Sequence, residues 1–327
     1  MEARADGLVD PRSLVGQARI VSPDLARTLT AYEFEVEGLQ GFPLDASVNF
    51  EGSPERLILK EVVVVSGASH AELEGVVGNP ATLEGMSLKV TAESPDLLEL
   101  FRPSGRAPVS KLPFEIAGSV AKVETGFTLN EIKARLAGGD IELNGLLSTE
   151  PNYAGSALSL SAAGANLQQV LGPWVAQEIP AERFDVQAEL NYQPPLMQIE
   201  TLRADIAGNL INGHFDISGD GDELDGRGSV TLSGPSSSSL YQLLGLDFSD
   251  YLPDTNYSLK MQLKGDSVAL NVAPLSLKLG ESDLSGTLAL QFSPTLAVNA
   301  DLLSRYLDLT YLVPDIETLE AQEEAST

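Results

Sequence analysis

The clearest feature of the chain is an alternation of apolar and polar residues that returns with a period of about 70 residues, as in a repeat protein. The alternating stretches begin at Leu44, Phe114, Phe184 and Tyr257, which are almost evenly spaced. An alternation with a period of two is typical of a β-strand that has one apolar face and one face in water. The pattern therefore predicts a repeated β structure.

Two further signals recur in the same order within each repeat. A second apolar alternation follows the first at a constant offset, and a glycine comes at a nearly constant distance after that. The second alternations begin at Val62, Ile132, Leu202 and Leu275, and the glycines are Gly75, Gly145, Gly213 and Gly286. Signals in a fixed order and spacing indicate a repeat protein.

A short helical pattern closes each unit. Apolar residues at positions i, i+3 and i+4 predict one or two turns of amphipathic helix in Leu25–Leu29, Leu97–Phe101, Leu167–Leu171 and Leu240–Leu244. We expect the N-caps, or residues next to them, to be Asp24, Asp96, Asn166 and Ser239, with glycine following at Gly172 and Gly245. A further copy around Asp301–Leu303 comes early, so we expect the last repeat to lack a hairpin.

Together these signals predict a mainly β fold: an elongated, curled antiparallel sheet that forms a groove. Each repeat of ~70 residues would supply about five strands plus one short helix. The expected organisation is a tail of a preceding repeat (1–42), repeat 1 (43–112), repeat 2 (113–182), repeat 3 (183–255), a shortened repeat 4 (256–313) and an acidic linker (314–327). Because the pattern begins in the middle of a repeat, we expect this sequence to be a piece of a longer protein.

The alternation also predicts which side chains share one apolar surface. We expect that surface to hold Leu44, Ala46, Val48, Phe114, Ile116, Val120, Ile132, Leu136, Phe184, Val186, Leu190, Leu202, Ile206, Leu259, Met261, Leu263, Leu275 and Leu277. Their polar neighbours should face water, namely Glu115, Lys133, Asp185, Arg203 and Lys260. The predicted helices are too short to cover such a surface, so lipid tails are candidates to cover the rest.

Charge and composition narrow the class of partner. The chain has 20 Lys and Arg against 47 Asp and Glu, a formal net charge of −27. Nucleic acid is excluded as a partner because phosphate binding needs clustered Lys and Arg. The 43% of hydrophobic residues suffice for a folded structure, and the absence of Cys removes disulfides and thiolate chemistry.

The sequence contains no arrangement of residues typical of a catalytic site. We interpret the chain as not an enzyme and expect neither a cofactor nor a metal. His70 and His214 are the two histidines, and both read as solvated strand residues. Asp216, Asp220, Asp222 and Asp225 surround a Gly-Asp cluster that hints at calcium, but the spacing is not that of an EF-hand and favours a hairpin turn.

The repeat unit resembles that of a known family. The stretch from Leu112 to Trp174, LPFEIAGSV through LNEIKARLAGGDIELNGLLS to GANLQQVLGPW, is similar to the unit of AsmA-like proteins, which are related to TamB and to eukaryotic bridge-like lipid-transfer proteins. The segment from Ser304 to Asp315, SRYLDLTYLVPD, also resembles one found in this family. The resemblance implies a periplasmic protein of outer-membrane biogenesis, tethered to the bacterial inner membrane by an N-terminal helix absent from this chain.

Three hypotheses follow. In the first, the apolar groove holds or conducts phospholipid or other lipid acyl chains between the inner and outer membranes. In the second, a non-transporting periplasmic scaffold with a filled interior influences outer-membrane protein assembly by binding assembly proteins. The third, a β-helix adhesin or polysaccharide-active enzyme, conflicts with the long repeat and its helix, because β-helix coils are much shorter.

Overall fold

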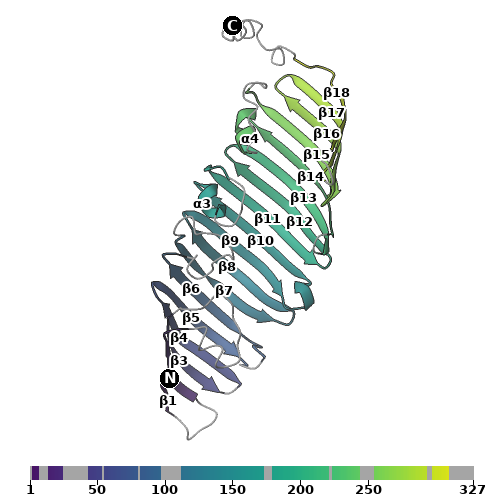
Figure 1. Cartoon of the computed structure of the whole chain (residues 1–327). Helices are drawn as coiled ribbons and strands as arrows, with labels where there is room; N and C mark the ends of the chain where they lie inside the picture. Colours follow the sequence, from purple (N-terminus) through teal and green to yellow (C-terminus); the bar gives the residue numbers. More distant parts are fainter. Residues whose placement is uncertain are drawn as a thin grey trace. The chain divides into compact units, whose positions relative to one another are not determined.

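The fold is mainly β. In a computed structural model, the structure describes residues 2–6, 14–24, 43–53, 55–79, 82–96, 112–172, 179–220, 223–243, 254–292 and 297–308 (Figure 1). The chain divides into two compact units, Met1–Gln177 and Glu178–Thr327. Within each unit the described strands form an antiparallel sheet, which confirms the predicted fold class.

The first unit is an antiparallel sheet in which each described strand pairs with the next one along the chain. The strands are β1 (Glu2–Asp6), β2 (Leu14–Ser22), β3 (Leu44–Ser53), β4 (Arg56–Ser66), β5 (Ser69–Gly78), β6 (Ser87–Ser94), β7 (Phe114–Val123), β8 (Gly126–Leu136), β9 (Gly139–Ser148) and β10 (Ser156–Gly164). A short 3-10 helix, η1 (Pro151–Tyr153), precedes β10, and helix α3 (Leu167–Leu171) follows it.

The second unit continues the same design. Its described strands are β11 (Phe184–Gln193), β12 (Leu196–Ile206), β13 (Asn209–Asp220), β14 (Glu223–Gly234), β15 (Tyr257–Asp266), β16 (Ala269–Leu279), β17 (Ser282–Gln291) and β18 (Ala297–Leu303). They too pair in chain order. Helix α4 (Ser237–Leu243) lies between β14 and β15.

Each repeat supplies four described strands, whereas the sequence pattern predicts about five. Repeats 1 to 4 correspond to β3–β6, β7–β10, β11–β14 and β15–β18. The strands are long, so four of them and a helical segment take up most of each repeat. In the part of the chain that the structure describes, substantial contacts between strands join sequence neighbours only, so no second sheet packs on either face.

A β-bulge at the same place in every repeat explains the repeated glycine. The register shifts between Leu59 and Val62, Leu129 and Ile132, Ile199 and Leu202, and Val272 and Leu275, and a repeat glycine pairs beside each shift. The extra residue on one strand bends and twists it. Gly145 has a φ of 130°, and a Cβ there would collide with the carbonyl oxygen of Ala157. Gly75 and Gly286 are equally constrained, with φ of 137° and 154°.

Both described α-helices, α3 and α4, overlap segments where the apolar spacing predicts a helix. Asn166 caps α3, because its side-chain oxygen accepts a hydrogen bond from the Gln169 amide at 3.1 Å. In α4 the prediction of Ser239 is corrected: the helix begins at Ser237, and Ser236 Oγ accepts from the Ser239 amide at 3.1 Å. The predicted helices Leu25–Leu29 and Leu97–Phe101 lie outside the described residues, as do Gly245 and the acidic linker.

The predicted early helical copy at Asp301–Leu303 is wrong. These residues end strand β18, which pairs with β17 from Gln291 to Ser285. Repeat 4 therefore keeps its second hairpin within the described chain. The reason is that Val298, Ala300 and Leu302 alternate with polar or small residues, and pairing of this period-two pattern with β17 overrides the short apolar pair Leu302-Leu303.

Candidate functional site

Strand pairing places apolar side chains of successive strands on one face of the first unit, here called the apolar face. Residues that pair directly in an antiparallel sheet project from the same side. One row across the strands runs Ala46, Val64, Ala71, Ala92, Ile116, Ala134, Ile141 and Ala162, and the next runs Val48, Val62, Leu73, Val90, Gly118, Ile132, Leu143 and Leu160. No charged residue interrupts either row.

The second unit has an equivalent apolar face. One of its rows runs Val186, Ala204, Ile211, Leu232, Leu259, Leu277 and Leu284, and the next runs Ala188, Leu202, Gly213, Val230, Met261, Leu275 and Gly286. The first of these rows has larger side chains than the first row of the first unit, which is rich in alanine. The bulges preserve the face, because each shifts the register without turning an apolar side chain to the opposite side.

Every residue predicted to share an apolar surface lies on the apolar face of its own unit. Phe184 is buried, with 3% of its surface exposed, and the others are half-buried. The five polar neighbours predicted to face water, Glu115, Lys133, Asp185, Arg203 and Lys260, are exposed. The predicted strand register is therefore confirmed, whereas the binding of lipid by this face stays a prediction.

Sequence reasoning missed about half of the apolar face, because it used two of the four strands in each repeat. The missed strands contribute Leu73, Val90, Leu143, Leu160, Ile211, Val230 and Leu284. These strands also alternate, but alanine and glycine hold many of their apolar positions. Small residues weaken a hydrophobicity signal even when they occupy the buried side of a strand.

One end of the apolar face is closed by buried contacts in the second unit. The Tyr257 hydroxyl donates to Asn209 Oδ1 at 2.7 Å, and Asn209 Nδ2 donates to Ser239 Oγ of α4 at 2.9 Å. Asn209 and Leu240 are buried there as well. Burial raises the pKa of Tyr257 to about 12, since a phenolate would lose its hydration at this position.

The corresponding end of the first unit is also packed. Leu112 is 1% exposed, and its amide donates to Asp96 Oδ1 at 3.0 Å, which joins the end of β6 to the start of β7. Leu167 and Val170 of α3 are buried. In both units, therefore, the described helix side of the apolar face is closed, while the middle rows remain half-exposed.

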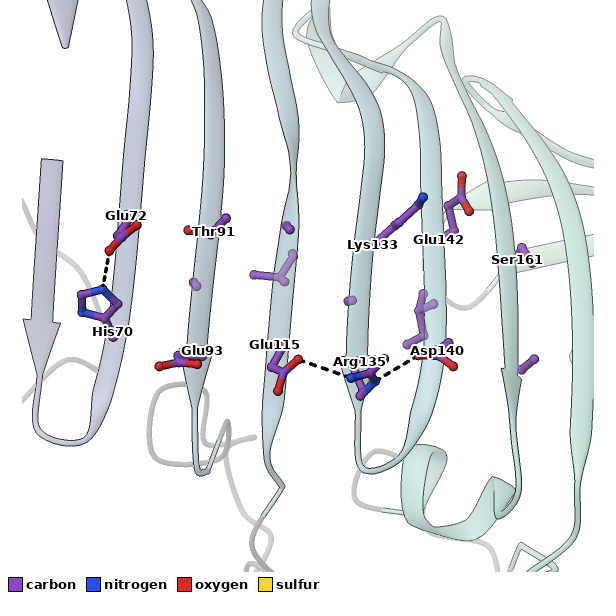
Figure 2. Close-up of a pocket in the computed structure, with 16 residues that line it drawn as sticks. His70, Glu72, Thr91, Glu93, Glu115, Lys133, Arg135, Asp140, Glu142 and Ser161 are labelled. Atoms are coloured by element: carbon purple, nitrogen blue, oxygen red, sulfur yellow. Dashed lines mark hydrogen bonds and ion pairs between the residues drawn. The ribbon is translucent and has the colours of Figure 1, made fainter. Parts of the chain in front are cut away.

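The opposite side of each sheet, here called the polar face, carries the charged side chains. In the first unit it contains a shallow hollow of about 800 Å³. Figure 2 shows Arg135 between Glu115 and Asp140, at 3.6 and 3.2 Å, and His70 beside Glu72 at 3.1 Å. Charged side chains line the hollow together with Ile116, Ala134 and Ile141.

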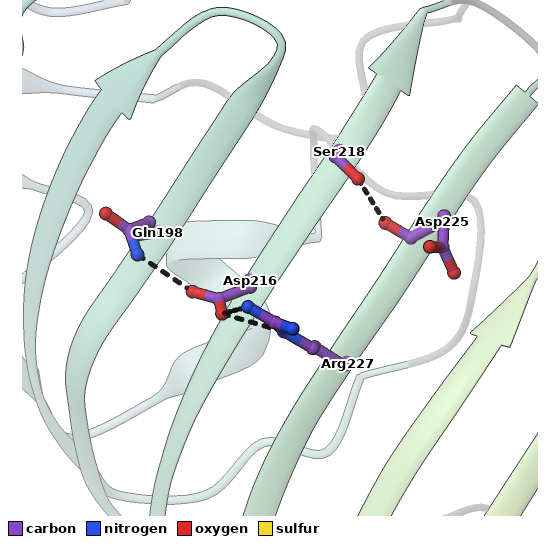
Figure 3. A network of polar contacts seen from close by, with 5 residues as sticks. All are labelled: Gln198, Asp216, Ser218, Asp225 and Arg227. Carbon is purple, nitrogen blue, oxygen red and sulfur yellow. Dashed lines mark hydrogen bonds and ion pairs between the residues drawn. The ribbon is translucent and has the colours of Figure 1, made fainter.

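On the polar face of the second unit, Asp216 joins three strands. Its Oδ1 accepts from Gln198 Nε2 at 3.0 Å, and its Oδ2 accepts from Arg227 Nε and Nη2 at 3.0 and 2.9 Å (Figure 3). The hydrogen bond from Gln198, followed by the one from Arg227, lowers the pKa of Asp216. Asp225 also lies in a strand, where its carbonyl accepts from Ser218 Oγ at 3.5 Å.

The two histidines lie on the polar faces of their units, His70 on β5 and His214 on β13. His70 contacts Glu72, and His214 Nδ1 lies 2.9 Å from Ser229 Oγ. Asp222 and the side chain of Asp220 lie outside what the structure describes. Across the described ranges, no three His, Asp or Glu side chains are grouped so that they could hold a metal ion.

Comparisons with family models, curated proteins and solved structures return no match for this chain. Among the helices that the structure describes, none has the length and apolar character needed to cross a membrane.

Proposed function

We propose that the protein holds lipid acyl chains on the apolar faces of its sheets and contributes in this way to outer-membrane biogenesis in the periplasm. The observation that supports the proposal is the apolar surface of each unit, whose two central rows no charged residue interrupts and which no second layer of the described chain covers. A surface of this kind on a monomer marks a binding site for an apolar partner.

The chemistry of the face fits an acyl chain better than a compact ligand. The two apolar rows described in each unit repeat from strand to strand without a polar side chain, so affinity along these rows comes from contact area. Each CH₂ group moved from water onto an apolar surface contributes up to ~0.8 kcal/mol. A long chain therefore gains more than a small apolar molecule, and it can shift along the rows without losing a specific bond.

The periplasmic location and the bridging of the inner and outer membranes rest on the resemblance of Leu112–Trp174 to AsmA-like repeats. In this proposal the protein needs no nucleotide and no catalytic group. Its partners are phospholipid or other lipid acyl chains, and the inner membrane through an anchor on the longer protein.

A scaffold that recruits outer-membrane assembly proteins is the second candidate, and the hollow on the polar face favours it. A charged depression between β5 and β10 offers a surface for a polar protein partner. The carboxylates of Glu72, Glu93, Glu115 and Glu142 line the depression and disfavour an acyl chain there. The two candidates thus use opposite faces of the same sheet.

Lipid extraction separates the candidates. The full chain is purified without detergent, extracted with organic solvent and analysed by mass spectrometry, and an acidic protein of similar size from the same cells serves as the control. Phospholipid at one or more molecules per chain supports the lipid function. A lipid-free sample that also fails to take up a fluorescent phospholipid from vesicles would overturn it in favour of the scaffold.

A further inference from the structure

Charged residues are sorted between the two faces with one exception. Outside the bulges, every Asp, Glu, Lys and Arg whose side chain is described on a strand lies on the polar face, except Lys122 of β7. Lys122 pairs with Phe127, and Phe127 pairs with Leu147, so all three share the apolar face. A cation on the apolar face needs a physical explanation, because the other charged strand residues outside the bulges lie on the polar face.

The surroundings of Lys122 leave its charge without a carboxylate partner in the described structure. The ammonium lies 5.0 Å from the centre of the Phe127 ring and 3.4 Å from Thr149 Oγ1. No ion pair among the described residues involves it, whereas Arg135 and Lys89 on the polar face both contact carboxylates. The Phe127 ring and the Thr149 hydroxyl orient the ammonium but do not neutralise it.

The position of Lys122 along the strand matches that of a lipid headgroup. Lys122 is next to the last residue of β7, at the turn that leads to β8. The other end of the same strand begins at Phe114, on the row that leads through Leu136, Gly139 and Gly164 to α3. Half-exposed apolar rows therefore lie between a closed helical end and one cation at the turn end.

We propose that Lys122, together with the Thr149 hydroxyl, binds the phosphate of an anionic phospholipid whose acyl chains lie on the apolar face of the first unit. This proposal rests on the lipid function proposed above. The remaining surface disfavours anions, because the chain carries a net charge of −27 and its strand charges are concentrated on the polar face. Lys122 therefore sets both the headgroup preference and the direction in which the lipid lies.

The test compares two lipids with identical acyl chains, phosphatidylglycerol and diacylglycerol, which differ by the charged headgroup. Affinities are measured by displacement of a fluorescent fatty acyl probe from the full chain. We expect Lys122→Gln to weaken phosphatidylglycerol binding about tenfold and to leave diacylglycerol unchanged, since one charge-assisted hydrogen bond is lost. Lys122→Arg should retain most of the preference, and Lys133→Gln, on the polar face, should change neither lipid.

The outcomes separate this proposal from the function on which it rests. If neither lipid binds the wild-type chain, the lipid function fails and this assignment fails with it. If both bind but Lys122→Gln leaves their ratio unchanged while thermal unfolding shows a folded protein, the headgroup assignment alone is overturned. Water-soluble glycerol phosphate supplies the last arm, because Lys122-dependent binding of this headgroup without tails would point to a soluble phosphoester and refute the lipid assignment.

Discussion

A charge placed within the apolar face should abolish lipid binding while the same charge on the neighbouring residue should not. Ile132 and Lys133 are adjacent on β8, yet Ile132 is half-buried on the apolar face and Lys133 is exposed on the polar face. We predict that Ile132→Asp loses acyl-lipid binding and that Lys133→Asp retains it. Both variants carry a new aspartate on the same strand, so the face is the variable that differs.

The expected loss of lipid affinity in Ile132→Asp follows from the two states that the new carboxyl group can adopt, charged or protonated. Under a bound acyl chain it would lose hydration with no cation beside it, which costs several kcal/mol. Protonation of the carboxylate avoids this cost, but at pH 7 it requires about 4 kcal/mol for a carboxyl group with an ordinary pKa near 3.9. Binding across Ile132 should therefore weaken by roughly a hundredfold or more. The folded state suffers less, about 1 to 3 kcal/mol, because Ile132 is half-buried without lipid.

The pH dependence of lipid binding by Ile132→Asp tests this reasoning more sharply than the loss of binding at pH 7. At pH 5 the cost of protonation falls to about 1.5 kcal/mol, so lipid binding by Ile132→Asp should recover substantially between pH 7 and pH 5. Ile132→Asn cannot be rescued in this way and is the matched control. The assay is displacement of a fluorescent acyl probe, with circular dichroism to verify folding. Equal binding by folded Ile132→Asp and Lys133→Asp at pH 7 would refute the reasoning.

Two further predictions concern stability. Gly145→Ala should lower the free energy of unfolding by about 2 to 4 kcal/mol in thermal melts, because Gly145 has a φ of 130° and the new Cβ would collide with the Ala157 carbonyl oxygen. Gly138→Ala is the control. Its φ is 82° but the space around it is open, so it should lower the free energy of unfolding by about 1 kcal/mol. The raised pKa of Tyr257 means that the folded state retains the phenolic proton more tightly, so its stabilising contribution is full below about pH 10 and is lost as the pH rises to about 12. Tyr257→Phe should lose stability less steeply over that range in denaturant titrations, and parallel curves would contradict this.

The sequence predicts the sheet well because the two faces have opposite chemistry. A shift of register by a single position at Phe114 would move Glu115 onto the apolar face, so the alternation determines the register as well as the strand. The repeat glycines are also visible in the sequence, but their cause is not. The extra residue at Glu131 that creates the bulge has no distinctive side chain, and it becomes apparent when Leu129 and Ile132 are seen to pair with Gly145 and Leu143.

The local pattern of apolar and polar residues did not predict two other features, the strand at Leu302-Leu303 and the position of Lys122. The pair Leu302-Leu303 suits a helix as well as a strand, and pairing with β17 decides between them. Lys122 was missed because the predicted apolar set on β7 stops at Val120, although the same alternation, extended by one more step, places Lys122 on that face. A polar residue at an apolar position is easily interpreted as the end of a strand, and the structure is needed to show that β7 continues to Val123.

The apolar rows recur in every repeat, whereas Lys122 occurs in one, and this contrast bears on how the apolar face would handle lipid. Positions equivalent to Lys122 in the other repeats are Gly52, Tyr192 and Gly265, none of which is charged. If acyl chains bind as proposed, they meet similar apolar rows in every repeat, whereas the proposed headgroup contact occurs once among the described repeats. A repeated cation would hold a lipid at each repeat and oppose its movement, while a single cation on β7 can select and orient the lipid at one place. In this proposal the uniform apolar rows permit transfer, and Lys122 supplies the selectivity that uniform rows lack.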